Sequence, residues 1–536
     1  MARLGSSKVR TGCFTCKIRK VKCDETKPNC RRCSGTGRKC DGYPPKRQGE
    51  YSWPQLLEVK PTALGLTSGT SSEEARGLDF FRGVVAPALS GHSSSYFWTQ
   101  LVAQIGHQEP AVRHAVVAIS SMYEQMSVTH HSSLEFPRAR FAIGQYNLAL
   151  KELSSHVKDE SMVVLVCILF MCIETLQENK QAAIAHCRHG ITILNKCNGS
   201  SAWVRAHLLP IFVRLSIFPF FFGASADNFP CLGDLASDIP TSFTTLDDSC
   251  FALDSLVSRS IRLIRSVDSY RLKVTNAAFI PASLYEEQSS VESSLDAWQE
   301  RFSSFRLKTP PPNDLVGSYL ILQMKYLVSK IWLNSSFECS EMVYDRHLDR
   351  FQQLVDLARQ ILPWETKRSK VTSKPKFVFE MGYLPLLYFA VIKCRDLGIR
   401  LIALYSMKAI CVHRESLWDA NLMYSIGRRV IEIEHGINLE TTSFEGSPDL
   451  ESPLPPDELR IRDSVVTNDI KIRHDESGQS VSLRKVCFLV WSPGDGVGLM
   501  DEWVAIDPGC PLDLISQETN SAPWAYLSRM ISPLPT

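Results

Sequence analysis

Six cysteines stand at regular intervals in the stretch Cys13–Cys40, CFTCKIRKVKCDETKPNCRRCSGTGRKC. Their spacing is C-x2-C-x6-C-x6-C-x2-C-x6-C, so the half pattern C-x2-C-x6-C occurs twice. Structural zinc is tetrahedral and favours thiolates, so one ion needs four ligand positions and two ions need eight. Six thiolates fill eight positions if two of them bridge both ions, and each half then offers three ligands. The stretch therefore predicts a binuclear zinc cluster held by Cys13, Cys16, Cys23, Cys30, Cys33 and Cys40.

Two other interpretations of the cysteines are weaker. A disulfide knot of six cysteines has fifteen pairings, and such knots belong to secreted chains. The first residues, MARLGSSKVR, contain no apolar segment of the kind found in a secretory signal, so we expect reduced thiols. A single C-x2-C…C-x2-C zinc site would leave two thiols spare and would not explain why the two halves have matching arms.

The two halves of the array differ in charge. The basic segment KIRKVK lies between Cys16 and Cys23, whereas SGTGRK lies between Cys33 and Cys40. We expect a short helix in the first segment that begins at a metal-bound thiolate, because helix N-terminal amides and the helix dipole favour an anionic sulfur. Glycines in the second segment disfavour a helix there. The first half is therefore predicted to read a ligand and the second half to support it.

The small net charge of the chain conceals a strong asymmetry. Residues 1–48 hold 14 Lys and Arg against 3 Asp and Glu, a formal charge of +11, which two Zn²⁺ ions and six thiolates would lower to +9. The remaining residues hold 45 basic and 54 acidic side chains, a formal charge of −9. A compact basic module matches the polyanionic backbone of nucleic acid. A basic run alone is also typical of a solvated surface or a nuclear import signal, but its place inside a metal array favours double-stranded DNA.

The segment CFTCKIRKVKCDETKPNCRRC resembles the binuclear zinc cluster of the fungal Zn2Cys6 transcription regulators. The resemblance implies two zinc ions bridged by the first and fourth cysteines, which are Cys13 and Cys30. It also implies a cis peptide bond before Pro28 in the loop KPNC. The function it implies is a transcription factor of RNA polymerase II genes in the nucleus of a fungus, regulating a metabolic or secondary-metabolite pathway.

The same resemblance implies how the module meets DNA. In that family the first cluster helix enters the major groove and recognises a CGG triplet. Lysine and arginine donate to the N7 and O6 atoms of guanine, which is the physical basis of such a preference. The matching positions for base contact are Arg19 and Lys20, with Lys17 and Lys22 nearby. Contacts to phosphate, which position a module without reading sequence, are predicted for Arg10, Arg31 and Arg32.

A linker and a large helical body are predicted after the cluster. Residues 1–12 form a basic arm, residues 13–40 the DNA-binding domain, and residues 41–74 a flexible linker broken by prolines. This linker shows no heptad repeat, so a zipper is not expected, and the protein would bind DNA either as a monomer or as a homodimer formed through the body. Residues 75–440 show helical periodicity. Blocks such as PAVRHAVVAISSMYE and LFMCIETLQENKQAAIAHCRHGITIL resemble the regulatory domain of fungal-specific transcription factors, which implies an all-helical fold and contacts with coregulators.

Two further segments are predicted to complete the chain. Residues 441–459 are acidic and proline-rich, typical of a disordered spacer or, less readily, an activation segment. Residues 460–536 contain RIRDSVV, DIKIRHD, SVSLRKVCFLVW and EWVAI, which predict short strands in a small β-rich extension. The apolar run SMVVLVCILFMCIE is too short to span a bilayer, so we expect a buried central helix and no membrane segment.

The fold class is therefore mainly α: a small zinc cluster, a linker, a large helical domain and a small β-rich appendage. His186 and His189 could share a helix face but lack a third ligand, and we find no catalytic constellation. We accordingly expect a transcription factor and not an enzyme. The alternatives are an enzyme or small-molecule sensor in which the zinc module only localises the protein, and a zinc store or thiol redox switch. A cavity in the body with convergent polar side chains would favour the first alternative.

Overall fold

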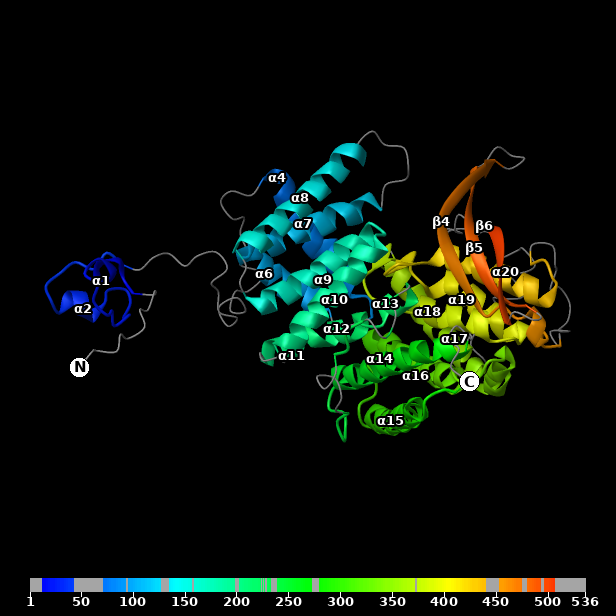
Figure 1. Cartoon of the computed structure of the whole chain (residues 1–536). Coiled ribbons are helices and arrows are strands. Elements are labelled where there is room, and N and C mark those ends of the chain that lie inside the picture. The colour runs from blue at the N-terminus through cyan, green and yellow to red at the C-terminus, as the bar shows by residue number, and fades with distance from the viewer. Residues whose placement is uncertain are drawn as a thin grey trace.

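A computed structural model of the chain shows a small cysteine-rich module, a large helical body and a three-stranded sheet (Figure 1). It describes residues 12–42, 71–92, 95–126, 135–156, 159–197, 202–222, 224, 226, 229–232, 239–271, 279–371, 374–439, 453–474, 480–492 and 496–506. The mainly helical fold class is confirmed. Within the described part of the chain, no helix combines the length and the apolarity needed to cross a membrane.

The first part of the body surrounds one apolar helix. Helix α9 (Glu160–Leu176) is buried along most of its length, because its sequence is apolar on every side. Asp159 accepts the Ser161 amide at 2.8 Å and so caps its N-terminus. The expected buried central helix is confirmed. Around it lie α4 (Ser72–Phe80), α5 (Ala86–Ser90), α6 (Val102–Gln108), α7 (Pro110–Gln125), α8 (Glu135–His156), α10 (Lys180–Lys196), α11 (Ala202–His207), α12 (Leu209–Leu215) and α13 (Phe218–Phe221).

Helix α10 approaches its neighbours closely at Gly190. A Cβ there would lie 2.3 Å from Cε1 and Cζ of Phe212 on α12, and 3.5 Å from Cβ of Cys167 on α9. Phe212 is fully buried, so its ring cannot move away without disturbing the core. The sequence block that contains Gly190 therefore needs a residue without a side chain at this position.

Gly190→Ala is expected to lower the free energy of unfolding by about 1–3 kcal/mol, because the added methyl group overpacks the core. The matched control is Gly144→Ala on α8, where an added Cβ would meet nothing within 4 Å. That control is expected to stabilise the helix by up to about 1 kcal/mol, since alanine is the better helix former. Urea unfolding followed by circular dichroism checks both variants. Equal midpoints for the two would contradict the close approach.

The second part of the body is built around a second apolar core. Helix α16 contributes to both cores, for example through Leu322 in the first and Met324 in the second. The remaining helices of the body are α14 (Leu246–Arg271), α15 (Ala282–Lys308), α16 (Val316–Ser335), α17 (Leu348–Val371), α18 (Leu384–Lys393), α19 (Leu397–Ile410) and α20 (Ala420–His435). Residues of α14 and α15 belong to the first core, and those of α17 to α20 belong to the second.

The body is not entirely helical, which corrects one expectation. Strand β1 (Phe377–Val378) pairs in parallel with β2 (Arg414–Glu415), and β2 pairs antiparallel with β3 (Trp418–Asp419). These two-residue strands are too short to produce an alternating sequence pattern. The carboxylate of Glu415 lies at the start of α18, where it accepts the amides of Gly382 at 2.8 Å and Leu384 at 2.9 Å.

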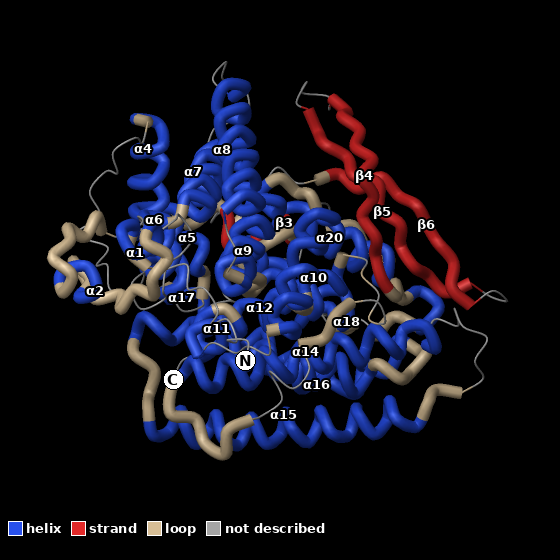
Figure 2. Tube along the Cα trace, turned by 60° about the vertical axis from the view of Figure 1, so that its left-hand side comes forward, coloured by secondary structure: helices blue, strands red, loops and turns tan. Residues whose placement is uncertain are grey.

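The C-terminal strands form a separate antiparallel sheet in the order β4-β5-β6, which lies beside α20 in both views (Figure 2). Strands β4 (Asp463–His474), β5 (Ser480–Ser492) and β6 (Gly496–Ala505) are longer than expected. Where the structure has the single strand β4, the sequence predicts two short strands. These lie on either side of the point between Val466 and Ile470 at which the pairing of β4 with β5 shifts register. Val486, Phe488 and Val504 join the second core, so the sheet is part of the folded body.

The end of the predicted disordered spacer has a defined structure. Residues 453–462 are described, with a 3₁₀ turn at Asp457–Leu459. The guanidinium of Arg460 is buried and forms a bidentate pair with Asp345 at 2.8 and 2.7 Å. The Ile461 amide donates to Oε1 of Glu434 on α20 at 2.7 Å. Polar contacts thus fix a segment whose composition alone is typical of disorder, and residues 440–452 lie outside the described residues.

A buried ionic network lies where this segment meets the helices. Glu341 accepts from Lys393 Nζ at 2.9 Å and from Arg395 Nη2 at 3.3 Å, and its other carboxylate oxygen accepts from Arg271 at 3.5 Å. Glu434 accepts from Arg395 at 3.4 Å and from Arg400 at 2.7 Å. Burial alone would raise the pKa of both carboxyl groups, but the facing cations hold each pKa below its ordinary value. We call these six side chains, together with Asp268 and Arg265, the buried charge network.

Candidate metal centre and nucleic-acid interface

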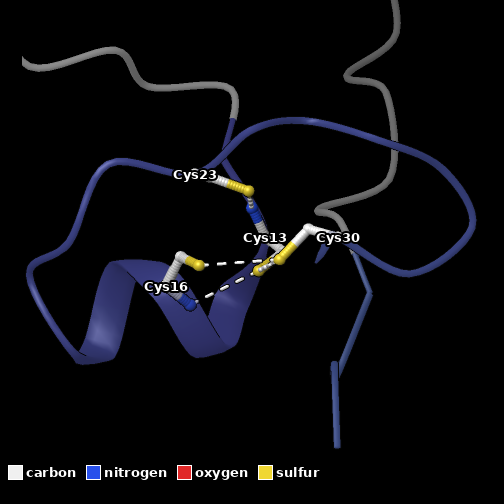
Figure 3. Close-up of side chains that lie close together, drawn as sticks. All are labelled: Cys13, Cys16, Cys23 and Cys30. Carbon is white, nitrogen blue, oxygen red and sulfur yellow. Dashed lines mark hydrogen bonds between the residues drawn. The ribbon is translucent and has the colours of Figure 1, made fainter. Parts of the chain in front are cut away.

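The six cysteine sulfurs of residues 13–40 form two overlapping groups of four. One group contains Cys13, Cys16, Cys23 and Cys30, and the other contains Cys13, Cys30, Cys33 and Cys40. Within each group the sulfur atoms all lie within 4.8 Å of one another. Figure 3 shows the first group converging on one point. The six thiols are free of disulfides, which excludes the knot.

The sulfur separations fit zinc. Four sulfurs at about 2.3 Å from a tetrahedral zinc ion lie about 3.8 Å apart. The Sγ atom of Cys13 lies 3.6 Å from that of Cys30 and 3.8 Å from that of Cys33, and Cys16 and Cys30 are separated by 3.7 Å. In the described part of the chain, His, Cys, Asp and Glu side chains gather closely enough to hold an ion only in these two groups. His186 instead lies 3.4 Å from the hydroxyl of Tyr146.

The two cysteines that belong to both groups also begin the two helices of the module. Cys13 is the N-cap of α1 (Phe14–Ile18), and its sulfur accepts the Cys16 amide at 3.3 Å. Cys30 is the N-cap of α2 (Arg31–Ser34), and its sulfur accepts the Cys33 amide at 3.3 Å. Amides at a helix N-terminus favour an anionic sulfur. The duplicated sequence pattern therefore folds into two equivalent helix starts that meet at the metal site.

This geometry corrects the expected position of the first helix. It begins at Phe14 and ends at Ile18, and does not extend from Cys16 to Cys23. The cause is the cap at Cys13 on one side and, on the other, Lys20, whose φ of 56° is in the left-handed region and ends the helix. The Lys27–Pro28 peptide bond is cis, as the resemblance implied.

Burial keeps most of the sulfurs away from water. Cys13, Cys30 and Cys33 are fully buried and Cys16 is 1% exposed, although this part of the chain is very small. Burial raises the pKa of the Cys13, Cys16 and Cys30 thiols, so the protein alone does not favour their thiolates. The backbone amides of Cys30 and Gly42 lower the pKa of Cys40. Zinc would supply the positive charge that holds the buried sulfurs as thiolates.

The basic side chains lie outside the sulfur cluster. Lys17 is exposed in the last turn of α1, and Lys20 and Lys22 are exposed just beyond it. Arg19 is half-buried, and its Nη1 atom lies 3.3 Å from the Thr36 hydroxyl as donor. Arg31 and Arg32 are exposed on α2, whereas Arg10 lies outside the described residues. Residues 12–42 hold nine basic and three acidic residues, a formal charge of +6 before metal binding.

Sequence reasoning missed one acidic residue that shapes the module. Asp24 accepts the amides of Thr26 at 3.1 Å, Arg31 at 3.1 Å and Arg32 at 2.6 Å, and it also accepts from the Thr26 hydroxyl. That hydroxyl, followed by the amides, lowers the pKa of Asp24 to about 2. Asp24 thereby ties the loop after Cys23 to the start of α2. The sequence offers little signal for this role, because Asp24 is one of two adjacent carboxylates after Cys23 and its partners are mostly backbone amides.

Comparison with known proteins agrees with this geometry. The fungal Zn(2)-Cys(6) binuclear cluster domain matches residues 11–50, and the fungal specific transcription factor domain matches residues 76–369. The second match covers more than half of the chain. The chain belongs to the fungal Zn2Cys6 transcription regulators, and zinc is the metal of its cysteine cluster.

The relatives are transcription regulators by name. An aspercryptin biosynthesis cluster-specific transcription regulator of Emericella nidulans is 26% identical over 400 residues, 66% of this chain and 64% of the relative. Transcription regulator lscL of Purpureocillium lilacinum is 27% identical over 205 residues, 34% of this chain and 48% of the relative. The chain thus spans less than two thirds of these curated relatives. No solved structure gives a significant match.

Proposed function

We propose that this protein is a sequence-specific transcription factor that reads a CGG-type triplet in the major groove, in the nucleus of a fungus, at genes transcribed by RNA polymerase II. The observation that carries the proposal is the pair of four-sulfur groups that share Cys13 and Cys30. In the proposal all six cysteines are zinc ligands and these two bridge the ions. The cluster replaces the hydrophobic core that a module of this size lacks.

The reading surface of the proposal is the end of α1. Its N-terminus is anchored at the metal site through the Cys13 cap, so its C-terminal end projects from the cluster. Lys17, Lys20 and Lys22 are exposed there, and their ammonium groups can donate to guanine edges. Arg19 joins this surface but is braced by Thr36, which positions its guanidinium. Arg31 and Arg32 on α2, and Arg10, would contact phosphates.

Lys20→Ala is expected to weaken binding to a CGG duplex by about tenfold or more, and to weaken binding to a scrambled duplex much less, because it removes a base contact. The matched control is Arg31→Ala, which removes an exposed charge on α2. This control should weaken both duplexes alike and reduce the slope of log affinity against log salt by about 1. Fluorescence anisotropy at several salt concentrations measures both effects. Equal losses on both duplexes for Lys20→Ala would contradict base reading.

The proposal also covers the target genes and the number of protein molecules that bind one DNA site. The relative from Emericella nidulans is named for a biosynthesis cluster, which supports a metabolic or secondary-metabolite pathway as the target. The helical body is proposed to mediate homodimerisation and coregulator contact, because the linker sequence has no zipper pattern. Selection of binding sites from random DNA with the full chain separates the arrangements: one CGG indicates a monomer, and two at a fixed spacing indicate a dimer.

The division of the chain into domains is part of the proposal, and we keep the boundaries predicted from the sequence. Residues 13–40 would read DNA, residues 41–74 would link, and residues 75–440 would regulate. Helix α4 begins at Ser72, within the predicted linker, and a capping box between Ser71 and Glu74 fixes that start.

A further inference from the structure

A cavity of about 870 Å³ lies at the seam between the two cores of the body. Its wall is assembled from segments far apart in the sequence, including α12, α13 and α14 from one side and α16, α18 and β4 from the other. Binding pockets for small organic molecules have volumes of roughly 300–1,000 Å³. The cavity therefore has the size of a small-molecule site, and neither the DNA-binding role nor the family assignment uses it.

Aromatic rings form much of the wall. Phe221 meets Trp418 edge to face at 5.5 Å between centroids, and it lies 6.0 Å from Trp332. Tyr388 and Trp418 are 6.0 Å apart. These rings come from α13, α16, α18 and β3, so the aromatic surface is formed only in the folded body. The aromatic residues that line the cavity are Phe218, Phe220, Phe221, Phe222, Trp332, Tyr344, Phe379, Tyr388, Phe389 and Trp418. A flat apolar ligand can stack on such a wall.

The polar side chains of the wall need acceptors. Of the buried donor atoms that have no hydrogen-bond partner among the described residues, three belong to lining residues: Nε of Arg265, Nε of Arg462 and Nε1 of Trp418. No orphaned oxygen atom in the described part of the chain belongs to a lining residue. A buried donor without a partner is costly, so a ligand that brings acceptor oxygens is favoured.

The wall also carries an excess of positive charge. Its lining residues include nine lysines and arginines and six carboxylates. Four of the six carboxylates pair with cations of the wall: Glu380 forms a bidentate pair with Arg214 at 2.6 and 3.0 Å, Asp268 is shared by Arg265 at 2.9 Å and Arg271 at 3.0 Å, and Asp254 and Glu178 pair with Lys325 and Arg414.

The buried charge network behind the wall also has more cations than carboxylates, five to three. Arg265, Arg271 and Lys393 of this network also line the cavity. Buried charge of one sign is stabilised by a counter-charge.

We propose that this cavity binds a small planar aromatic molecule that carries a carboxylate, with the rings against the aromatic wall and the anionic oxygens at Arg265 and its neighbours. The guanidinium of Arg265 lies 5.7 Å from the ring centre of Trp332, so this cation stands close to the aromatic wall. The same side chain can therefore meet both the ring and the carboxylate of the ligand. The inference goes beyond DNA binding and does not depend on it.

The test is calorimetric titration of the full chain with 2-naphthoate, a planar aromatic carboxylate. Two matched probes serve as controls: 2-naphthylmethylammonium carries a positive charge in place of the negative one, and 2-methylnaphthalene is uncharged. Saturable binding of 2-naphthoate is expected, at least about tenfold tighter than binding of either other probe. Absence of saturable 2-naphthoate binding up to about 1 mM, or equal binding of all three probes, would overturn the proposal.

Variants locate the site. Arg265→Gln on α14 is expected to weaken 2-naphthoate binding by about tenfold. Arg259→Gln is the matched control on the same helix, because its guanidinium pairs with Glu287 at 2.9 Å and does not line the cavity. This control should leave affinity unchanged. Trp418→Phe keeps an aromatic ring, although a smaller one, but removes the orphaned donor and is expected to lower affinity severalfold. Unchanged affinity in both cavity variants would place the naphthoate elsewhere and refute the assignment.

Discussion

Replacing Cys30 with serine is expected to remove both zinc ions from the full chain, because this one sulfur belongs to both four-sulfur groups. Cys23→Ser alters a single group and is expected to leave about one ion bound. Zinc binding supplies about 10–16 kcal/mol to the folding of small zinc modules. Cys30→Ser should therefore abolish binding to the CGG duplex at any salt concentration, whereas mutation of a basic residue only weakens it.

Elemental analysis after dialysis against buffer measures the metal content, and anisotropy measures DNA binding on the same samples. The unaltered chain is expected to hold two zinc ions for the six thiols of residues 13–40. Cys339→Ser, at an exposed cysteine outside the cluster, is the control and should keep both ions. One ion in the unaltered chain, or identical zinc contents in Cys23→Ser and Cys30→Ser, would refute the shared ligand.

Glu434→Ala is expected to destabilise the helical body by about 3–5 kcal/mol. The change leaves the buried guanidinium of Arg400 without its carboxylate and leaves that of Arg395, also fully buried, with Glu341 as its remaining carboxylate partner. It also removes the acceptor of the Ile461 amide, which holds the segment leading into β4. Trypsin should then cleave at Arg460 and Arg462 before it cleaves the helices.

Urea unfolding followed by tryptophan fluorescence measures this loss. Asp356→Ala is the control, because its pair with Arg359 at 3.1 Å is partly exposed and contributes at most about 1 kcal/mol. Glu434→Gln keeps an oxygen for the Ile461 amide but not the charge, so most of the loss should persist in it. If Glu434→Ala and Asp356→Ala unfold at the same urea concentration, the network does not stabilise the body.

The cysteine cluster could be predicted in detail because its ligands are adjacent in sequence. Metal geometry constrains spacing directly, so the duplicated pattern predicted two bridging thiolates, and the resemblance to the fungal Zn2Cys6 regulators implied that these are Cys13 and Cys30. The predicted start of α1 was wrong because the metal-binding cysteine that caps the helix is Cys13 and not Cys16. Asp24 was overlooked because its partners are backbone amides, which carry no sequence signal.

The sequence predicted that the body is helical, but it did not predict which parts of the body contact one another. Periodicity located α9 and its buried character, since an amphipathic or apolar pattern is local. The cavity wall instead joins residues from Glu178 to Ile506, and no local pattern predicts such a meeting. The buried charge network was equally hidden, because Glu341 and Glu434 are ordinary polar residues in sequence and become buried only through tertiary packing.

The attachment of the final sheet to the second core has a genetic consequence. Ile461, Val486, Phe488 and Val504 all pack into that core, and Arg460 closes a bidentate pair with Asp345. A stop codon before residue 453 would delete these groups together and leave the apolar residues beneath them in water. Nonsense alleles late in the reading frame should therefore behave as complete loss of the regulator, even though the DNA-reading end of the polypeptide is translated intact.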